Sequence, residues 1–134
     1  MTTSKKFLLG VALSGATIFA EMLFPPGPGL LFLAFLLAAL GGLYAGFALM
    51  DGRPFELAME LGFLLVIAFV CLGSLLKWPL LLAAGFFAHG LWDFAHHWRF
   101  LEKAMPSWIP PFCVAYDWAI AAFIAWRWGF GAAS

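Results

Sequence analysis

Charge is what this sequence has least of, since only 10% of its 134 residues are Asp, Glu, Lys or Arg, against roughly 25% in a typical soluble domain. The seven basic and seven acidic residues cancel to a formal net charge of zero. The chain therefore has no basic field to attract nucleic acid and no acidic tail to hold a segment disordered, and both classes are excluded. Cysteine is also scarce: Cys71 and Cys113 form no C-x-x-C pair and no zinc-like spacing, and we expect both to be core thiols.

What the sequence has in excess is apolar surface, because 65% of its residues are hydrophobic and 19% are aromatic. A water-soluble domain of this length could not bury so much apolar surface. The apolar residues also fall in long runs rather than in alternating patches. The sequence therefore predicts an integral membrane protein.

Proline, glycine and charge divide these runs into five segments, each close to the roughly 20 residues that a helix needs to cross about 30 Å of hydrocarbon. Their expected bounds are 7–24, 30–50, 55–76, 79–100 and 112–128. A helix satisfies its own backbone hydrogen bonds, so runs of this length indicate helices rather than strands. We therefore predict one transmembrane domain over residues 1–134, an all-α bundle of five membrane-spanning helices.

The distribution of Lys and Arg predicts how this bundle is oriented, because short cytoplasmic loops retain positive charge. An N-in/C-out arrangement leaves only Lys77 and Arg127 on the outer side. The five other basic residues then lie on the cytoplasmic side: Lys5, Lys6, Arg53, Arg99 and Lys103. This arrangement suits a multi-pass protein of an inner or plasma membrane. The first segment also has the form of a secretory signal, and we expect it to be retained.

Because an ionisable group inside a span costs about 2.5–3.5 kcal/mol, the few that occur there are the candidate functional residues. The fourth segment holds all three histidines of the chain. At about 100° per residue, His89, Asp93, His96 and His97 share one sector of the helix, roughly 100° wide. Imidazole and carboxylate together are ligands for zinc or iron, so we expect a divalent transition metal, Zn or Fe, as the cofactor.

Depth in the membrane adds acids from two other segments. Glu60, Asp93 and Asp117 each lie about five residues, or roughly 7 Å, from the cytoplasmic end of their helices. Glu56 shares a face with Glu60 but lies near enough to the interface to contact headgroups, whereas Glu21 lies at the opposite end and should not belong to the site. The candidate metal ligands are His89, Asp93, His96, His97, Asp117 and Glu60, and the candidate catalytic residues are Asp93, Asp117 and Glu60.

The string from His89 to His97 resembles a fragment of the histidine boxes of membrane desaturases and hydroxylases, with Asp93 standing where one box has His. That resemblance implies a di-iron site that activates oxygen on a lipid. Three histidines with one aspartate are also similar in content to membrane zinc hydrolases of the alkaline-ceramidase and adiponectin-receptor kind. That second resemblance implies a zinc ion that activates water.

Three functions fit these residues. The first is a metal-dependent membrane enzyme acting on a lipid or another apolar substrate, with an unligated carboxylate as general base. The second is a proton or metal-ion transporter that uses the acids and histidines as a relay. The third is a non-catalytic membrane subunit or assembly factor, in which the polar cluster only fixes helix register. The partners we expect are membrane lipid, a second copy of the chain or a larger membrane complex, and no nucleic acid.

Overall fold

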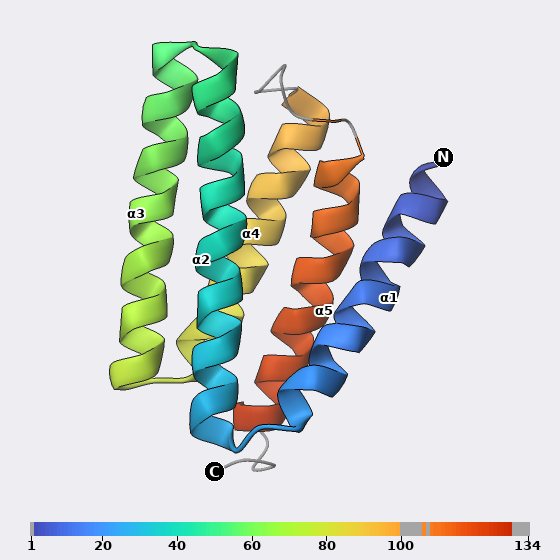
Figure 1. The fold of residues 1–134 in the computed structure, drawn as a ribbon, viewed down its shortest axis with the longest axis vertical. Helices are drawn as coiled ribbons and strands as arrows, with labels where there is room; N and C mark the ends of the chain where they lie inside the picture. The colour runs from blue at the N-terminus through green and yellow to red at the C-terminus, as the bar shows by residue number, and fades with distance from the viewer. Residues whose placement is uncertain (1, 100–105, 107, 130–134) are drawn as a thin grey trace.

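The computed structural model is all-helical, as the sequence predicts, and it describes residues 2–99, 106 and 108–129, with side chains described through His96 in the fourth helix. The helices run in alternating directions along the bundle (Figure 1). Their bounds are α1 Thr3–Met22, α2 Pro26–Asp51, α3 Pro54–Leu76, α4 Leu80–Arg99 and α5 Ile109–Gly129.

Three helices begin three or four residues earlier than expected. Helix α1 begins at Thr3 rather than at Phe7, where the Thr2 side chain accepts a hydrogen bond from the Lys5 backbone N–H. Proline explains the other two differences. Helix α2 begins at Pro26 rather than at Leu30, and α5 begins at Ile109 rather than at Phe112. Proline lacks the backbone N–H that would be unpaired in a first turn anyway, and its fixed φ suits a helix start. Proline-rich stretches that we expected to lie outside the helices therefore form their first turns.

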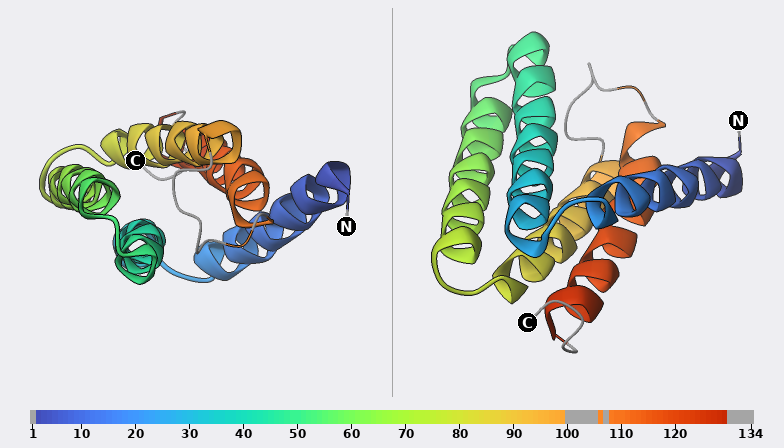
Figure 2. Two further views of the ribbon diagram at one scale, coloured as in Figure 1. Left: turned by 90° about the horizontal axis from the view of Figure 1, so that it is seen from above. Right: turned by 60° about the horizontal axis from the view of Figure 1, so that its bottom comes forward.

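Seen from above, the helices form a curved row in the order α2, α3, α4, α5 and α1 (Figure 2). The most extensive packing joins α4 to α5, followed by α1 to α5 and α2 to α3. Helix α4 lies between α3 and α5, and α2 approaches it much less closely. Helix α4 therefore presents side chains to neighbours on both sides, which is what positions the candidate site.

Apolar side chains from four helices form the main core below the polar groups of α4. Its members on α4 are Leu82 and Phe86, both fully buried. The other helices contribute Leu30, Leu33, Ala34 and Leu37 from α2, Ile67 and Cys71 from α3, and Tyr116, Ile120, Ala121, Phe123 and Ile124 from α5.

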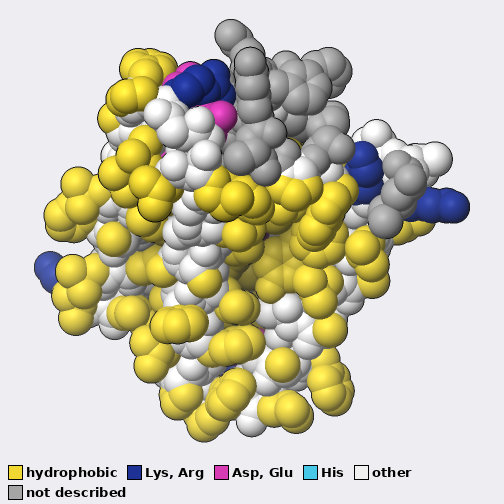
Figure 3. Space-filling model, turned by 45° about the horizontal axis from the view of Figure 1, so that its top comes forward, with side chains coloured by type: hydrophobic (Ala, Val, Ile, Leu, Met, Phe, Trp, Pro, Cys, Tyr) yellow, Lys and Arg dark blue, Asp and Glu magenta, His cyan; other side chains and the backbone are white. Residues whose placement is uncertain are grey.

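The surface differs from that of a soluble protein, because apolar side chains cover it as well as forming the core. Large apolar side chains such as Phe19, Phe35 and Phe69 are 66–73% exposed, while most of the acids and histidines described are buried. On the face drawn in Figure 3, hydrophobic side chains cover most of the surface and charged ones gather mainly along its upper edge. Among the described residues, α2, α3 and α5 are long and apolar enough to cross a membrane. The chain therefore has the character of a membrane protein.

Candidate metal centre

A close approach of α5 to α4 brings the first polar groups together. Gly90 of α4 lies against the indole of Trp118, so that any Cβ at this position would overlap the ring. The Trp118 Nε1–H donates a hydrogen bond to the backbone oxygen of Phe87 at 3.3 Å, and the two rings stack with centroids 5.6 Å apart. Because Asp117 immediately precedes Trp118, this contact sets Asp117 beside His89.

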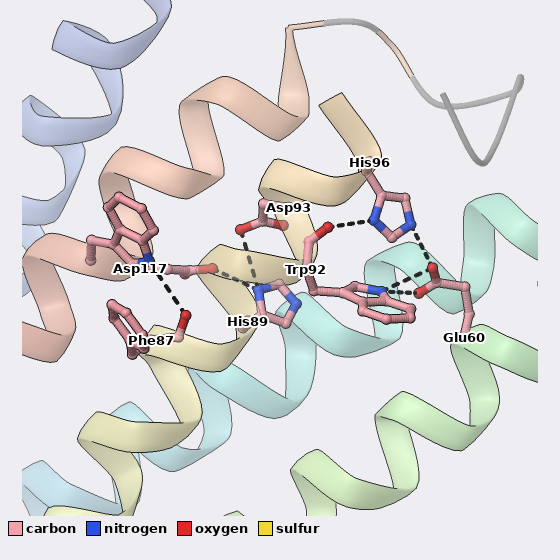
Figure 4. A network of polar contacts seen from close by, with 8 residues as sticks. Glu60, Phe87, His89, Trp92, Asp93, His96 and Asp117 are labelled. Atoms are coloured by element: carbon pink, nitrogen blue, oxygen red, sulfur yellow. Dashed lines mark hydrogen bonds and ion pairs between the residues drawn. The ribbon is translucent and has the colours of Figure 1, made fainter. Parts of the chain in front are cut away.

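His89, Asp93 and Asp117 form one buried cluster, in which one atom of each residue lies within 4.8 Å of the others. His89 Nδ1 lies 2.6 Å from Asp117 Oδ2 and 3.5 Å from Asp93 Oδ2, and Figure 4 shows both carboxylates directed at this nitrogen. All three side chains are 0% exposed. One imidazole and two carboxylates at this spacing could hold a metal ion.

The charge of the cluster is compatible with a bound cation. With both acids ionised, the two carboxylates outweigh the single positive charge of a protonated imidazole, and a buried charge of this kind must be balanced by a proton or a cation. Moreover, four buried atoms of the cluster have no hydrogen-bond partner among the described residues: His89 Nε2, both Asp93 oxygens and Asp117 Oδ1. Buried polar atoms in folded proteins are nearly always satisfied. A metal ion would use some of these atoms as ligands and would balance the excess negative charge.

A second polar cluster lies where α4 packs against α3. Glu60 Oε1 lies 2.5 Å from His96 Nε2, and both Glu60 oxygens accept hydrogen bonds from Trp92 Nε1–H at 3.0 and 3.1 Å (Figure 4). His96 Nδ1 donates to the backbone oxygen of Trp92 at 2.7 Å. Phe63 stacks on the Trp92 ring with centroids 4.4 Å apart. Glu60 and His96 are thus engaged with each other rather than with His89.

Tyr44 of α2 joins the two clusters and is not among the candidates predicted from the sequence. Its ring stacks on His96 at 4.5 Å and on His89 at 5.4 Å, measured between centroids. Tyr44 is 1% exposed, and its hydroxyl has no hydrogen-bond partner in the described part of the chain. Its depth in the membrane could have marked Tyr44 as a candidate, because it lies seven residues from the end of α2, at the same end of the bundle as Glu60 and Asp93.

The structure thus places the predicted site residues in two groups rather than one. It brings His89, Asp93 and Asp117 together and pairs Glu60 with His96. The side chain of His97 lies outside those described. Glu56 belongs to neither group, because it forms an ion pair at 3.2 Å with Arg53 at the start of α3.

Glu21 lies apart from the site, as the sequence analysis expected. Arg127 Nε is 3.1 Å from Glu21 Oε1, an ion pair without hydrogen-bond alignment, and Arg127 Nη2 donates to the backbone oxygen of Phe24. Asp117 precedes Arg127 by ten residues on α5, which is about 15 Å along the helix. This pair therefore fastens α1 to α5 at the opposite end of the bundle.

Comparisons with protein-family models, with curated proteins and with solved structures find no match to this chain. The buried residues themselves therefore carry the functional conclusion, which begins from membrane-type helices and a His/Asp group that could hold a metal ion.

Proposed function

We propose that this protein is a small metal-dependent membrane enzyme that acts on a lipid or another apolar substrate. One observation carries the proposal: ligand atoms of His89, Asp93 and Asp117 lie within 4.8 Å of one another, and all three residues are buried. Catalytic metal sites commonly use three protein ligands, which leaves a coordination position for solvent or substrate. The donor set suits zinc or iron.

The metal ion would supply Lewis acidity for hydrolysis or a centre for oxygen-dependent oxidation. Asp93 and Asp117 would hold the ion together with His89. The Glu60–His96 pair would accept or return a proton, because its carboxylate and imidazole already share a hydrogen bond beside the centre. In this proposal Glu60 acts on protons rather than as a metal ligand.

We further propose that all five helices cross the membrane as one domain, with the N-terminus in the cytoplasm of an inner or plasma membrane. The start of α1 and the end of α5 lie at opposite ends of the bundle (Figure 1), as an odd number of crossings requires. Lipid would then reach the protein laterally, through its apolar surface. Gly42 and Gly46 face away from the described residues, which supports contact with a second copy or a larger membrane complex.

A non-catalytic subunit is the second candidate, and the complete burial of His89, Asp93 and Asp117 favours it. In that case the cluster would hold α4 and α5 in register without turning over a substrate. A transporter has less support, since the apolar core around Leu33, Phe86 and Ile124 lies between the centre and the Glu21–Arg127 pair.

Metal analysis of the purified full-length chain tests the centre. We expect about one equivalent of zinc or iron in the wild type and none in His89→Ala or Asp117→Asn. Glu60→Gln is the matched control and should retain the metal, because Glu60 contacts His96 and Trp92 instead. A wild type that holds no metal after growth in zinc and iron would contradict the metal centre.

An assay of lipid turnover then distinguishes the enzyme hypothesis from the hypothesis of a non-catalytic subunit. Metal-loaded wild type in liposomes made from total membrane lipids should change the lipid profile seen by mass spectrometry, and His89→Ala should not. A metal-loaded wild type that leaves every lipid and added apolar substrate unchanged would favour the subunit.

A further inference from the structure

We propose that Tyr44 positions Asp93 for metal binding, by donating a hydrogen bond from its hydroxyl to the Asp93 oxygen that does not bind the metal ion. The inference rests on the proposed metal centre and extends it to a third helix, α2. Tyr44 would act through Asp93 and is therefore a positioning residue.

The position of Tyr44 is fixed by its ring. The ring packs against both His89 and His96, at centroid distances of 5.4 and 4.5 Å and interplanar angles of 28° and 12°. Its hydroxyl lies close enough to Asp93 and Asp117 to interact with both carboxylates electrostatically. The stacked ring thus holds the hydroxyl at the edge of the His/Asp cluster.

Unmet hydrogen-bonding capacity points to Asp93 as the partner. Within the described residues, the Tyr44 hydroxyl and both Asp93 oxygens are buried without a hydrogen bond. Asp117 has one such oxygen, Oδ1, because its Oδ2 lies 2.6 Å from His89 Nδ1. If one Asp93 oxygen binds the metal ion, the other is an acceptor that needs a donor, and the phenol is a donor that needs an acceptor.

Tyr116, the other tyrosine of the chain, has a hydroxyl that already forms a hydrogen bond. Tyr116 Oη lies 2.8 Å from Thr17 Oγ1, in a hydrogen bond that joins α5 to α1 away from the His/Asp cluster. The chain has just these two tyrosines. Tyr116→Phe therefore removes a hydroxyl that already has a partner, whereas Tyr44→Phe removes one that gains its partner when metal binds.

Partners that orient a metal ligand typically contribute 10–100-fold to metal affinity. We therefore expect Tyr44→Phe, which keeps the stacking ring, to weaken binding by about 10–100-fold. Without metal, the same variant should melt at the wild-type temperature or above it, because it removes a buried hydroxyl that has no partner. A residue that only supports packing would not weaken metal binding while leaving the metal-free protein intact.

The experiment measures Zn²⁺ binding by calorimetry and thermal unfolding with and without Zn²⁺, on the full chain in detergent micelles. Tyr44→Phe should lose affinity but not metal-free stability, and Tyr116→Phe should lose metal-free stability but keep its affinity. Equal Zn²⁺ affinity in Tyr44→Phe and wild type would overturn the role of Tyr44 while leaving the centre in place.

Two other outcomes would also overturn the proposed role of Tyr44. Unfolding of Tyr44→Phe without metal would overturn the inference, because the hydroxyl would then stabilise the metal-free fold. A wild type that binds no Zn²⁺, while His89→Ala behaves identically, would overturn the metal centre and with it the role of Tyr44.

Discussion

The Glu21–Arg127 ion pair offers a direct test of how α1 is held in the bundle. Glu21 is 0% exposed and the Arg127 side chain is 11% exposed, so both charges lie out of water. Removing one partner of a buried pair costs about 3–5 kcal/mol, because the other charge is left uncompensated, whereas replacing both by apolar residues is often neutral. We therefore expect each single Leu substitution to destabilise the protein more than the double substitution does.

Because Glu21 and Arg127 have different surroundings, the two single substitutions should lower the unfolding free energy by different amounts. Arg127→Leu leaves the Glu21 carboxyl group without a cation and should cost about 3–5 kcal/mol of unfolding free energy. Glu21→Leu should cost nearer 3 kcal/mol, because Arg127 keeps its hydrogen bond to the Phe24 oxygen and lies 5.3 Å from the centre of the Trp128 ring. The double variant should remain within about 1 kcal/mol of the wild type.

Unfolding in mixed micelles by SDS titration, followed by circular dichroism, gives the four free energies of this cycle. Glu56→Leu is the matched control, since its ion pair includes an Arg53 side chain that is 40% exposed, and the substitution should cost at most about 1 kcal/mol. A double variant as unstable as the sum of the two singles would refute the reasoning, because the two charges would then act independently.

Two further predictions concern α2 and the orientation of the bundle. Gly29→Ala should lower the unfolding free energy by about 1–3 kcal/mol, because a Cβ at this position would overlap the Glu21 carboxylate. Gly27→Ala in the same turn is the control and should be neutral, because a Cβ there meets no described atom within 4 Å. Equal losses of unfolding free energy in the two variants would contradict this prediction. For the orientation, reporter fusions should place the N-terminus in the cytoplasm and the C-terminus outside; matching signals from the two ends would exclude an odd number of crossings.

The helices were predictable because the cost of unpaired backbone groups in lipid makes any long apolar run helical. The sequence therefore indicated the number and order of the helices. The expected starts at Phe7, Leu30 and Phe112 are all too late. For Leu30 and Phe112 the reason is proline, which breaks a helix in its interior but opens the first turn at these positions. Whether a proline ends a helix or begins one can be predicted only when its position relative to the helix start is known.

Three of the six candidate ligands, His89, Asp93 and Asp117, form one cluster that was also predictable from helix geometry. His89 and Asp93 are one turn apart on α4, and their depth matched that of Asp117 on the antiparallel neighbour. His96 shares their angular sector but lies seven residues from His89, about 10 Å along the axis. An angular projection hides that rise, so it predicted one cluster where the structure has two.

The division of the site has a chemical consequence that the sequence could not show. Helix α4 sends His89 and Asp93 toward α5 and sends Trp92 and His96 toward Glu60 on α3. A metal ion and a proton-sharing pair can therefore occupy neighbouring sites without competing for ligands. Because Tyr44 stacks on both histidines, movement of α2 would disturb both clusters at once. Helix α2, which contributes no expected ligand, thus couples the two clusters through Tyr44.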